Sequence, residues 1–162
     1  MESLTVRPAR RMDLPALLEM FTELAEYENL TDELIASEDS LAQALFSQTP
    51  LAYGLIAAKG SQAIGYAVFY RTFSTFLAAP GIWLEDLYVR PDHRTLGVGR
   101  APLAAVAARA VTEGCGRLEW SALDWNEPAL RFYRGLDATS MGNWVPHRLT
   151  GENLKRIAQE AR

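Results

Sequence analysis

The sequence is poor in cysteine and histidine, and each shortage excludes a class of protein. One cysteine, Cys115, in 162 residues cannot form a disulfide within the chain. A single cysteine is typical of a reducing compartment. The two histidines, His93 and His147, lie far apart and belong to no metal-ligand pattern, so we expect no metal site. Cys115 has no base beside it in sequence, which argues against a cysteine nucleophile.

Excess positive charge and long apolar runs are also missing. The formal net charge of −4 argues against a nucleic-acid partner. No stretch approaches the ~18 apolar residues of a membrane span, and the richest one, 101–111, contains a proline and an arginine. Three arginines within the first eleven residues are unlike a secretory leader. We therefore expect a cytoplasmic protein with no nucleic-acid and no membrane partner.

What the sequence does contain is an ordinary globular composition in which the apolar spacing changes along the chain. With 49% hydrophobic and 22% charged residues, the 162 residues predict a single domain over residues 1–162. The order of the elements predicts an α/β (α+β) layer fold with a mixed sheet. The predicted strands are 4–7, 51–58, 63–70, 82–89, 118–123 and 144–149, and the predicted helices are 13–25, one capped by Ser37, 98–112, 126–135 and 150–158.

The segment 87–100 combines a strand end, two glycines and a helix start. Gly97 and Gly99 would let the backbone approach a ligand closely. The N–H groups of Val98, Gly99 and Arg100 would point at an anion, near a helix start that carries roughly half a positive charge. This pattern predicts a pyrophosphate site, and its alternative is an ordinary tight turn before a helix. No lysine follows the second glycine and no third glycine completes the pattern, which argues against a P-loop and a Rossmann fingerprint.

The pattern Arg94-x-x-Gly97-x-Gly99, late in the chain, resembles the acetyl-CoA loop of the GNAT acetyltransferases. Further segments in the same order resemble the polyamine (diamine) and thialysine acetyltransferase branch of that superfamily. These segments are Arg7–Ala9, Glu23–Glu28, Trp83–Asp86, Asp124–Pro128 and Phe132–Tyr133. The resemblance runs over residues 4–158. It implies a GNAT fold, with a mixed central sheet of about six to seven strands flanked by helices, an acetyl-CoA co-substrate and a homodimer.

The sequence departs from this branch in three places. Thr95 and Asp137 stand where a glycine is usual, and Pro102 lies early in a predicted helix, where the first turn tolerates it. The segment 137–144 is shorter than in the polyamine enzymes and omits acidic residues that the family places near its substrate. This shortening weakens the expectation of polyamine specificity more than the expectation of catalysis.

The resemblance assigns the cofactor to one strand edge, the loop after it and one later side chain. It implies that backbone groups of Leu87–Val89 pair with the pantetheine arm and that one N–H there polarises the thioester carbonyl. It places Arg94 and Arg100 beside the pyrophosphate, although Arg100 could also be a solvated helix residue. Asn126 would contact the pantetheine arm or serve only as a helix N-cap. The full predicted set is Leu87, Tyr88, Val89, Arg94, Thr95, Leu96, Gly97, Val98, Gly99, Arg100 and Asn126.

The resemblance also implies two catalytic residues, Glu85 and Tyr133. A primary amine with a pKa of about 10.4 is only about one part in a thousand neutral near pH 7.5, so a proton must be removed. Glu85 would bind the amine or act as its base, and its alternative is a solvated strand carboxylate. Strand alternation predicts that Glu85 and Asp86 face opposite sides of the sheet, with Asp86 structural. Tyr133 would protonate the CoA thiolate, and its alternative is a core tyrosine beside Phe132.

The acceptor pocket implied by the resemblance combines aromatic rings with carboxylates, which suits a cation. Its members are Tyr27, Glu28, Glu85 and Trp144. Each has a structural alternative, in the core, on a solvated face or in packing. We expect direct transfer of an acetyl group to a small cationic amine, such as a polyamine, a diamine or a lysine-like amine. The alternatives are a protein or aminoglycoside-like amine as acceptor, and a non-catalytic acyl-CoA-binding module.

Overall fold

The computed structural model describes residues 3–94 and 97–161, which divide into two compact units, Met1–Ser121 and Ala122–Arg162. The first unit holds a sheet and three helices, and the second holds two short helices. Thr95 and Leu96, both predicted to contact the cofactor, lie outside the described residues.

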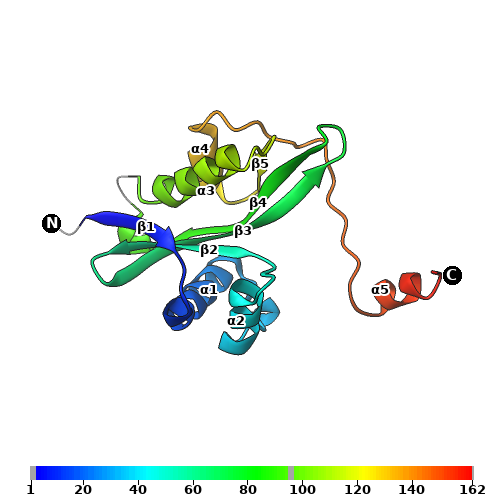
Figure 1. Cartoon of the computed structure of the whole chain (residues 1–162), viewed down its shortest axis with the longest axis horizontal. Helices are drawn as coiled ribbons and strands as arrows, with labels where there is room; N and C mark the ends of the chain where they lie inside the picture. Colours follow the sequence, from blue (N-terminus) through cyan, green and yellow to red (C-terminus); the bar gives the residue numbers. More distant parts are fainter. Residues whose placement is uncertain (1–2, 95–96, 162) are drawn as a thin grey trace. The chain divides into compact units, whose positions relative to one another are not determined.

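A mixed sheet forms the centre of the first unit (Figure 1). Its strands follow chain order, with antiparallel pairing from β1 to β4 and parallel pairing of β4 with β5. The strands are β1 (Leu4–Pro8), β2 (Tyr53–Lys59), β3 (Gln62–Ser74), β4 (Ala79–Val89) and β5 (Leu118–Glu119). The predicted fold class is confirmed, but the described residues form five strands, fewer than the six to seven expected.

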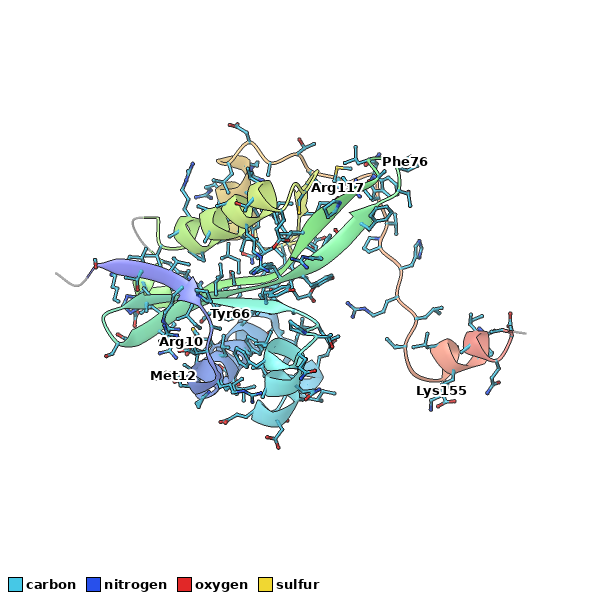
Figure 2. All side chains as sticks on the ribbon, viewed as in Figure 1. Arg10, Met12, Tyr66, Phe76, Arg117 and Lys155 are labelled. Atoms are coloured by element: carbon cyan, nitrogen blue, oxygen red, sulfur yellow. The ribbon has the colours of Figure 1, made fainter. Side chains whose placement is uncertain are left out.

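Helices cover both faces of this sheet (Figure 1). On one face lie α1 (Leu14–Glu28) and α2 (Glu38–Phe46), and on the other lies α3 (Arg100–Thr112). Tyr66 is fully buried in the core cluster between the sheet and α1 (Figure 2). Three short 3₁₀ helices, η1 (Arg11–Asp13), η2 (Thr31–Glu33) and η3 (Pro91–His93), connect these elements. The second unit contains α4 (Glu127–Arg134) and α5 (Gly151–Ala158).

Local signals place the helix ends where the sequence predicts them. The Ser37 hydroxyl accepts the N–H of Ser40 at 3.2 Å and so caps α2. Gly114, just past the end of α3, has a φ of 68°, the left-handed conformation that glycine adopts without strain. The Asn126 side chain accepts the N–H of Ala129 at 3.4 Å, which confirms its capping of α4.

Two strand predictions fail, both after α3. The segment predicted as 118–123 forms a strand only at Leu118–Glu119, and the segment 144–149 forms none. A strand requires a neighbour for its backbone groups, and the alternation of side chains does not say whether one is present. At the start of the second segment the N–H of Trp144 donates to the carbonyl of Met141 at 2.9 Å, which closes a turn instead.

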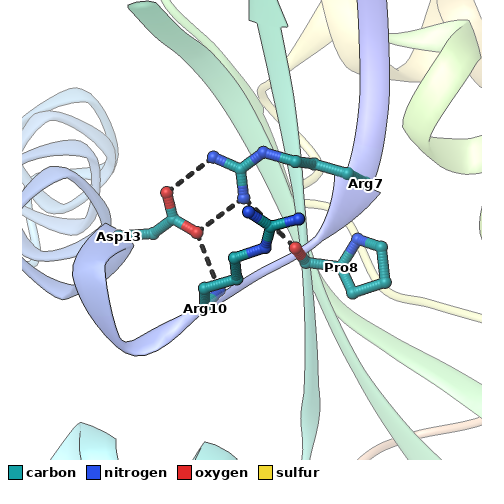
Figure 3. Close-up of polar contacts among 4 residues, drawn as sticks. All are labelled: Arg7, Pro8, Arg10 and Asp13. Atoms are coloured by element: carbon teal, nitrogen blue, oxygen red, sulfur yellow. Dashed lines mark hydrogen bonds and ion pairs between the residues drawn. The ribbon is translucent and has the colours of Figure 1, made fainter. Parts of the chain in front are cut away.

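An ion pair attaches the first strand to the first helix (Figure 3). Both guanidinium N–H groups of Arg7 donate to the carboxylate of Asp13 at 2.7 Å, and the N–H of Arg10 donates to the same carboxylate at 2.7 Å. Asp13 is only 7% exposed, and the hydrogen bonds from Arg7 lower its pKa more than burial raises it. This contact fixes where α1 begins, and therefore where its last turn meets the sheet.

Across the described chain, every helix falls short of the length and apolarity that a bilayer crossing requires.

Candidate functional site

A β-bulge at Glu85 breaks the alternation of β4. Val68 pairs with Asp86 and Phe69 pairs with Leu84, which leaves Glu85 as the extra residue. The indole N–H of Trp83 donates to the Glu85 carboxylate at 3.0 Å. A bulge re-aims side chains, and here it changes the face on which a carboxylate lies.

The two adjacent carboxylates consequently share one face of the sheet. Tyr70 pairs with Trp83 and also hydrogen-bonds Glu85, so Glu85 reaches the Tyr70 face. Asp86 pairs with Val68, two residues before Tyr70 in β3 and therefore on that same face. The prediction that Glu85 and Asp86 face opposite sides is wrong, because period-2 alternation does not hold through a bulge.

A hollow of about 180 Å³ lies between α1, η2 and this face of the sheet. Its lining is largely apolar but includes the carboxylates of Glu28, Glu33 and Asp86 and the ring of Tyr66. The Tyr66 hydroxyl lies 3.5 Å from an oxygen of Asp86, a long hydrogen bond. Of the predicted pocket residues, Glu28 thus lines a hollow, and Asp86, predicted to be structural, lines it too.

The negative charges of these carboxylates repel one another. Burial raises the pKa of Asp86 to about 6, with further contributions from the charges of Glu85 and Glu28. Burial also raises the pKa of Glu28. None of the ion pairs within residues 3–94 and 97–161 involves Glu28, Glu85 or Asp86. The arrangement therefore favours a cationic guest, which would lower the free energy of all three charged groups.

On the side of β4 that faces β5, no described strand pairs with β4 beyond Trp83. β5 pairs only with Ile82 and Trp83, and no other strand of the described chain pairs on that side of β4. Leu87–Val89 thus offer one strand edge to an extended ligand, as the predicted pairing with a pantetheine arm requires. On the other side these three residues pair with β3.

The glycine loop before α3 fits an anion only in part. Gly97 has a φ of 83°, a left-handed conformation that favours glycine, and an added Cβ there would meet nothing within 4 Å. An added Cβ at Gly99 would touch only Val89, at 3.8 Å. The N–H of Arg100, predicted to point at the anion, instead donates to the Gly97 carbonyl at 2.9 Å. Of the three predicted donors, Arg100 therefore offers its side chain rather than its backbone.

Arg94 lies against α1 and β4. Its Nε–H donates to the carbonyl of Val89 at 2.7 Å, and its guanidinium carbon lies 5.1 Å from the ring centroid of Tyr27 and 5.4 Å from that of Tyr88. The Tyr88 hydroxyl donates to Glu23 at 2.9 Å. Burial and Glu23 together raise the pKa of Tyr88 to about 12, although Arg94 opposes that shift.

Three predicted residues, Asn126, Tyr133 and Trp144, belong to the second unit. Within that unit Asn126 caps α4, the ring centroid of Tyr133 lies 5.3 Å from that of Phe132, and Trp144 is 70% exposed. The structure describes each unit by itself, so the roles of these residues toward the acceptor and cofactor stay predictions.

Sequence reasoning missed Asp86 as a pocket residue and Tyr66 as its partner. Tyr66 lies in an apolar run that predicts only a strand, and the bulge that turns Asp86 toward the pocket depends on the register between β3 and β4. The adjacent pair of acids was the one available signal. Within the described residues, no set of three histidine, cysteine, aspartate or glutamate side chains is arranged to hold a metal ion.

Comparison with known proteins places this geometry in a family. The model of the acetyltransferase (GNAT) family matches residues 14–137. The chain is 34% identical to a thialysine N-epsilon-acetyltransferase of Sus scrofa, over 98% of this chain and 99% of that protein. It is 27% identical to an L-ornithine N5-acetyltransferase of Arabidopsis thaliana, over 94% of this chain and 86% of that protein. The solved structure of an integron cassette protein of V. cholerae superposes on this chain with a TM-score of 0.80 at 25% identity. The superposition covers 99% of this chain and 100% of that protein.

Proposed function

The chain belongs to the GNAT family of acetyltransferases and is an N-acetyltransferase, and from that premise we propose that its acceptor is a small amine that carries positive charge. Thialysine and other lysine-like amines, diamines and polyamines are the candidate acceptors. The relatives named for thialysine and ornithine support this class.

The observation that carries the proposal is the group of carboxylates under α1. Glu28, Glu85 and Asp86 take part in no ion pair of the described chain, and burial makes the negative charges of Glu28 and Asp86 costly, while Glu85 is exposed beside them. An ammonium group would restore the balance. The indole of Trp83 and the ring of Tyr70 lie beside Glu85, and aromatic faces attract a cation further.

In the proposed mechanism, two carboxylates have separate tasks. Glu85, fixed by its hydrogen bond from Trp83, takes the proton of the reacting ammonium directly or through water. Asp86 and Glu28 hold positive charge in the hollow beside it. The neutral amine nitrogen that results is then competent to attack a thioester carbonyl, with no acyl-enzyme.

The cofactor assignment rests on the edge of β4 that faces β5 and on the loop after it. Acetyl-CoA is the co-substrate of GNAT acetyltransferases and supplies the acetyl thioester. Backbone groups of Leu87–Val89 would bind its extended arm and polarise the carbonyl. Gly97, Val98 and Gly99, with the side chains of Arg94 and Arg100, would bind the pyrophosphate.

The remaining proton transfer is assigned to the second unit. Tyr133 would donate its phenolic proton to the departing sulfur, since the pKa values of a phenol and a thiol, about 10 and about 8.5, are close enough for transfer. Asn126 would bind the cofactor arm, and Trp144 would line the acceptor site. These three assignments rest on the family resemblance.

We also propose that residues 1–162 act as one domain, in a cytoplasmic homodimer without metal, nucleic acid or membrane. The family match across residues 14–137 spans both units and supports a single functional domain. The lone cysteine supports a reducing compartment, and the net charge of −4 argues against nucleic acid.

The test is release of free thiol from acetyl-CoA in the presence of single amines. The panel is thialysine, lysine, ornithine, putrescine, spermidine, a peptide with a free amine and an aminoglycoside. We expect turnover with at least one of the small cations and a large loss of kcat/KM in Glu85→Gln. A matched control is Glu26→Gln, an exposed residue of α1 that makes no contact with the pocket.

Two outcomes would overturn the acceptor. Turnover only with the peptide or the aminoglycoside would show that the acceptor is a larger amine. If no amine of the panel leads to thiol release while acetyl-CoA still binds, the result would favour a non-catalytic acyl-CoA-binding module.

A further inference from the structure

Arg94 is a charged residue without a counter-ion among the residues that the structure describes. In the described chain it takes part in no ion pair, whereas nearby Arg90 pairs with Glu19 at 2.6 Å and with Glu23 at 3.2 Å. Arg94 is held instead by the carbonyl of Val89, by the rings of Tyr27 and Tyr88 and by a hydrogen bond with the Tyr88 side chain. Neutral partners of this kind bind a guanidinium more weakly than an anion does.

The position of Arg94 in the chain lets it serve two sites. It precedes Gly97 by three residues and so lies at the start of the loop proposed for the pyrophosphate. Its guanidinium nevertheless lies over the ring of Tyr27, which precedes Glu28 in the last turn of α1 and which the family resemblance assigns to the amine pocket. A guanidinium and a substrate ammonium would compete for the same ring face, because both are cations.

We propose that Arg94 couples the two substrates: it covers the Tyr27 ring in the cofactor-free protein, and a bound pyrophosphate draws it away and exposes that ring to the amine. This inference rests on the proposed function. It makes cofactor and amine bind cooperatively, with the cofactor favoured first, because without the pyrophosphate the ammonium group must itself displace Arg94 from the Tyr27 ring.

The neighbours of Arg94 allow this movement without collapse of the site. Tyr88 is anchored to α1 by its hydroxyl, which donates to Glu23 at 2.9 Å. Glu23 is held in turn by Arg90. Release of Arg94 therefore removes its own contacts and leaves the attachment of β4 to α1 in place.

Linkage makes the coupling measurable from either side. If CoA tightens amine binding by some factor, the amine must tighten CoA binding by the same factor. Isothermal titration of thialysine into the protein alone and into the protein saturated with CoA gives one value, and titration of CoA with and without thialysine gives the other. We expect a factor of roughly five or more, at the lower end of usual couplings.

Two variants with the same chemical change separate coupling from cofactor affinity. Arg94→Gln should bind thialysine without CoA about as tightly as the wild type does with CoA, so that the factor falls to about one. Arg100→Gln should weaken CoA binding but keep the wild-type factor, since the Arg100 side chain is exposed and the cation over the Tyr27 ring is Arg94. Equal factors in the two variants would overturn the proposal.

A second readout needs no amine. In spectra of ¹⁵N-labelled arginine, the Nε–H signal of Arg94, identified by its loss in Arg94→Gln, should shift when CoA is added, because its hydrogen bond to Val89 is broken. An unchanged signal at saturating CoA would overturn the proposal.

If thialysine binds equally well with and without CoA, the proposed coupling is wrong but the proposed acceptor is not affected. If thialysine and the other small amines neither bind nor react in any state, the proposed acceptor fails as well.

Discussion

Among single residues, Asp86 carries a charge that is unfavourable for stability and that lines the proposed amine pocket. Its carboxylate is desolvated and lies near Glu85 and Glu28, and its pKa is raised to about 6. The raised pKa means that the folded state holds the proton more tightly than the unfolded chain does. Stability therefore decreases as pH rises from the ordinary value of 3.8 through about 6.

Replacement of Asp86 should accordingly improve stability and impair function. At pH 7.5 Asp86→Asn should raise the melting temperature by roughly 2–4 °C, the shift expected for about 1 kcal/mol in a chain of this size. Near pH 4.5, where the wild-type residue is protonated, the difference should disappear. Thermal unfolding at the two pH values measures this. A lower melting temperature at both would show that Asp86 stabilises the fold.

The same carboxyl group should govern the pH profile with a cationic acceptor. Since only the ionised form attracts an ammonium, kcat/KM for the amine should rise with pH through about 6. In Asp86→Asn this rise should be absent and kcat/KM lower throughout. Initial rates between pH 5 and 8 give the profile. An identical profile in the variant would assign the titration to another group.

Tyr133 provides a separate prediction at this scale. Tyr133→Phe should lower kcat by about 10², the lower end of general-acid effects, while the KM for acetyl-CoA changes by only a few-fold. The ring and its contact with Phe132 are kept, so the variant loses only the hydroxyl. Steady-state kinetics with the best amine of the panel tests this, and unchanged turnover would remove Tyr133 as the acid.

Among elements, α1 depends on the first strand for its position. Asp13→Asn removes the charge that Arg7 binds through two hydrogen bonds, and should lower the free energy of unfolding by about 2 kcal/mol. The exposed Asp32→Asn is the matched control and should change it by less than about 0.5 kcal/mol. Urea unfolding at pH 7 measures both.

The pH dependence of that contribution has a definite sign. The pKa of Asp13 is lowered on folding, so its stabilisation is complete above the ordinary value of 3.8 and is lost as pH falls through the lower folded value. The difference in the free energy of unfolding between wild type and Asp13→Asn should therefore be constant from pH 5 to 7. In stronger acid this difference should decrease to zero. A difference that persists there would show that the carboxylate is not the source.

The loop before α3 is sensitive through its backbone. Gly97→Ala should weaken acetyl-CoA binding, because a φ of 83° strains a residue with a Cβ by about 1–2 kcal/mol although space for the Cβ is available. Gly99→Ala, where φ is −68°, should cost less stability. Calorimetric titration and thermal unfolding of the two variants compare them. Unchanged affinity in Gly97→Ala would undo the assignment of the loop.

At the scale of the whole molecule, apolar side chains exposed on the hairpin of β3 and β4 are relevant to the proposed homodimer. Phe73 is 67% exposed and Phe76, at the hairpin tip, is 97% exposed (Figure 2). Light scattering on a sizing column should give twice the chain mass of 18.0 kDa. A mass of one chain at micromolar concentration would contradict the homodimer and leave the enzymatic proposal intact.

The sequence by itself determined the local elements and the family. Helix caps such as Ser37, the turn glycine Gly114 and the glycines before α3 act through their own backbone and near neighbours, so their effect can be predicted from the chain order alone. The pattern around Arg94, together with the other segments that resemble the family and with the order of the elements, predicted the fold and the acetyl-CoA co-substrate.

Only the tertiary structure decided which side chains meet. The bulge at Glu85 depends on the register between β3 and β4, and it is this register that brings Asp86 to the pocket with Glu28. The contact of Arg94 with Tyr27 joins residues 67 positions apart, and the segment 144–149, whose alternation predicts a strand, forms none. Each depends on pairing between distant segments, which local spacing cannot encode.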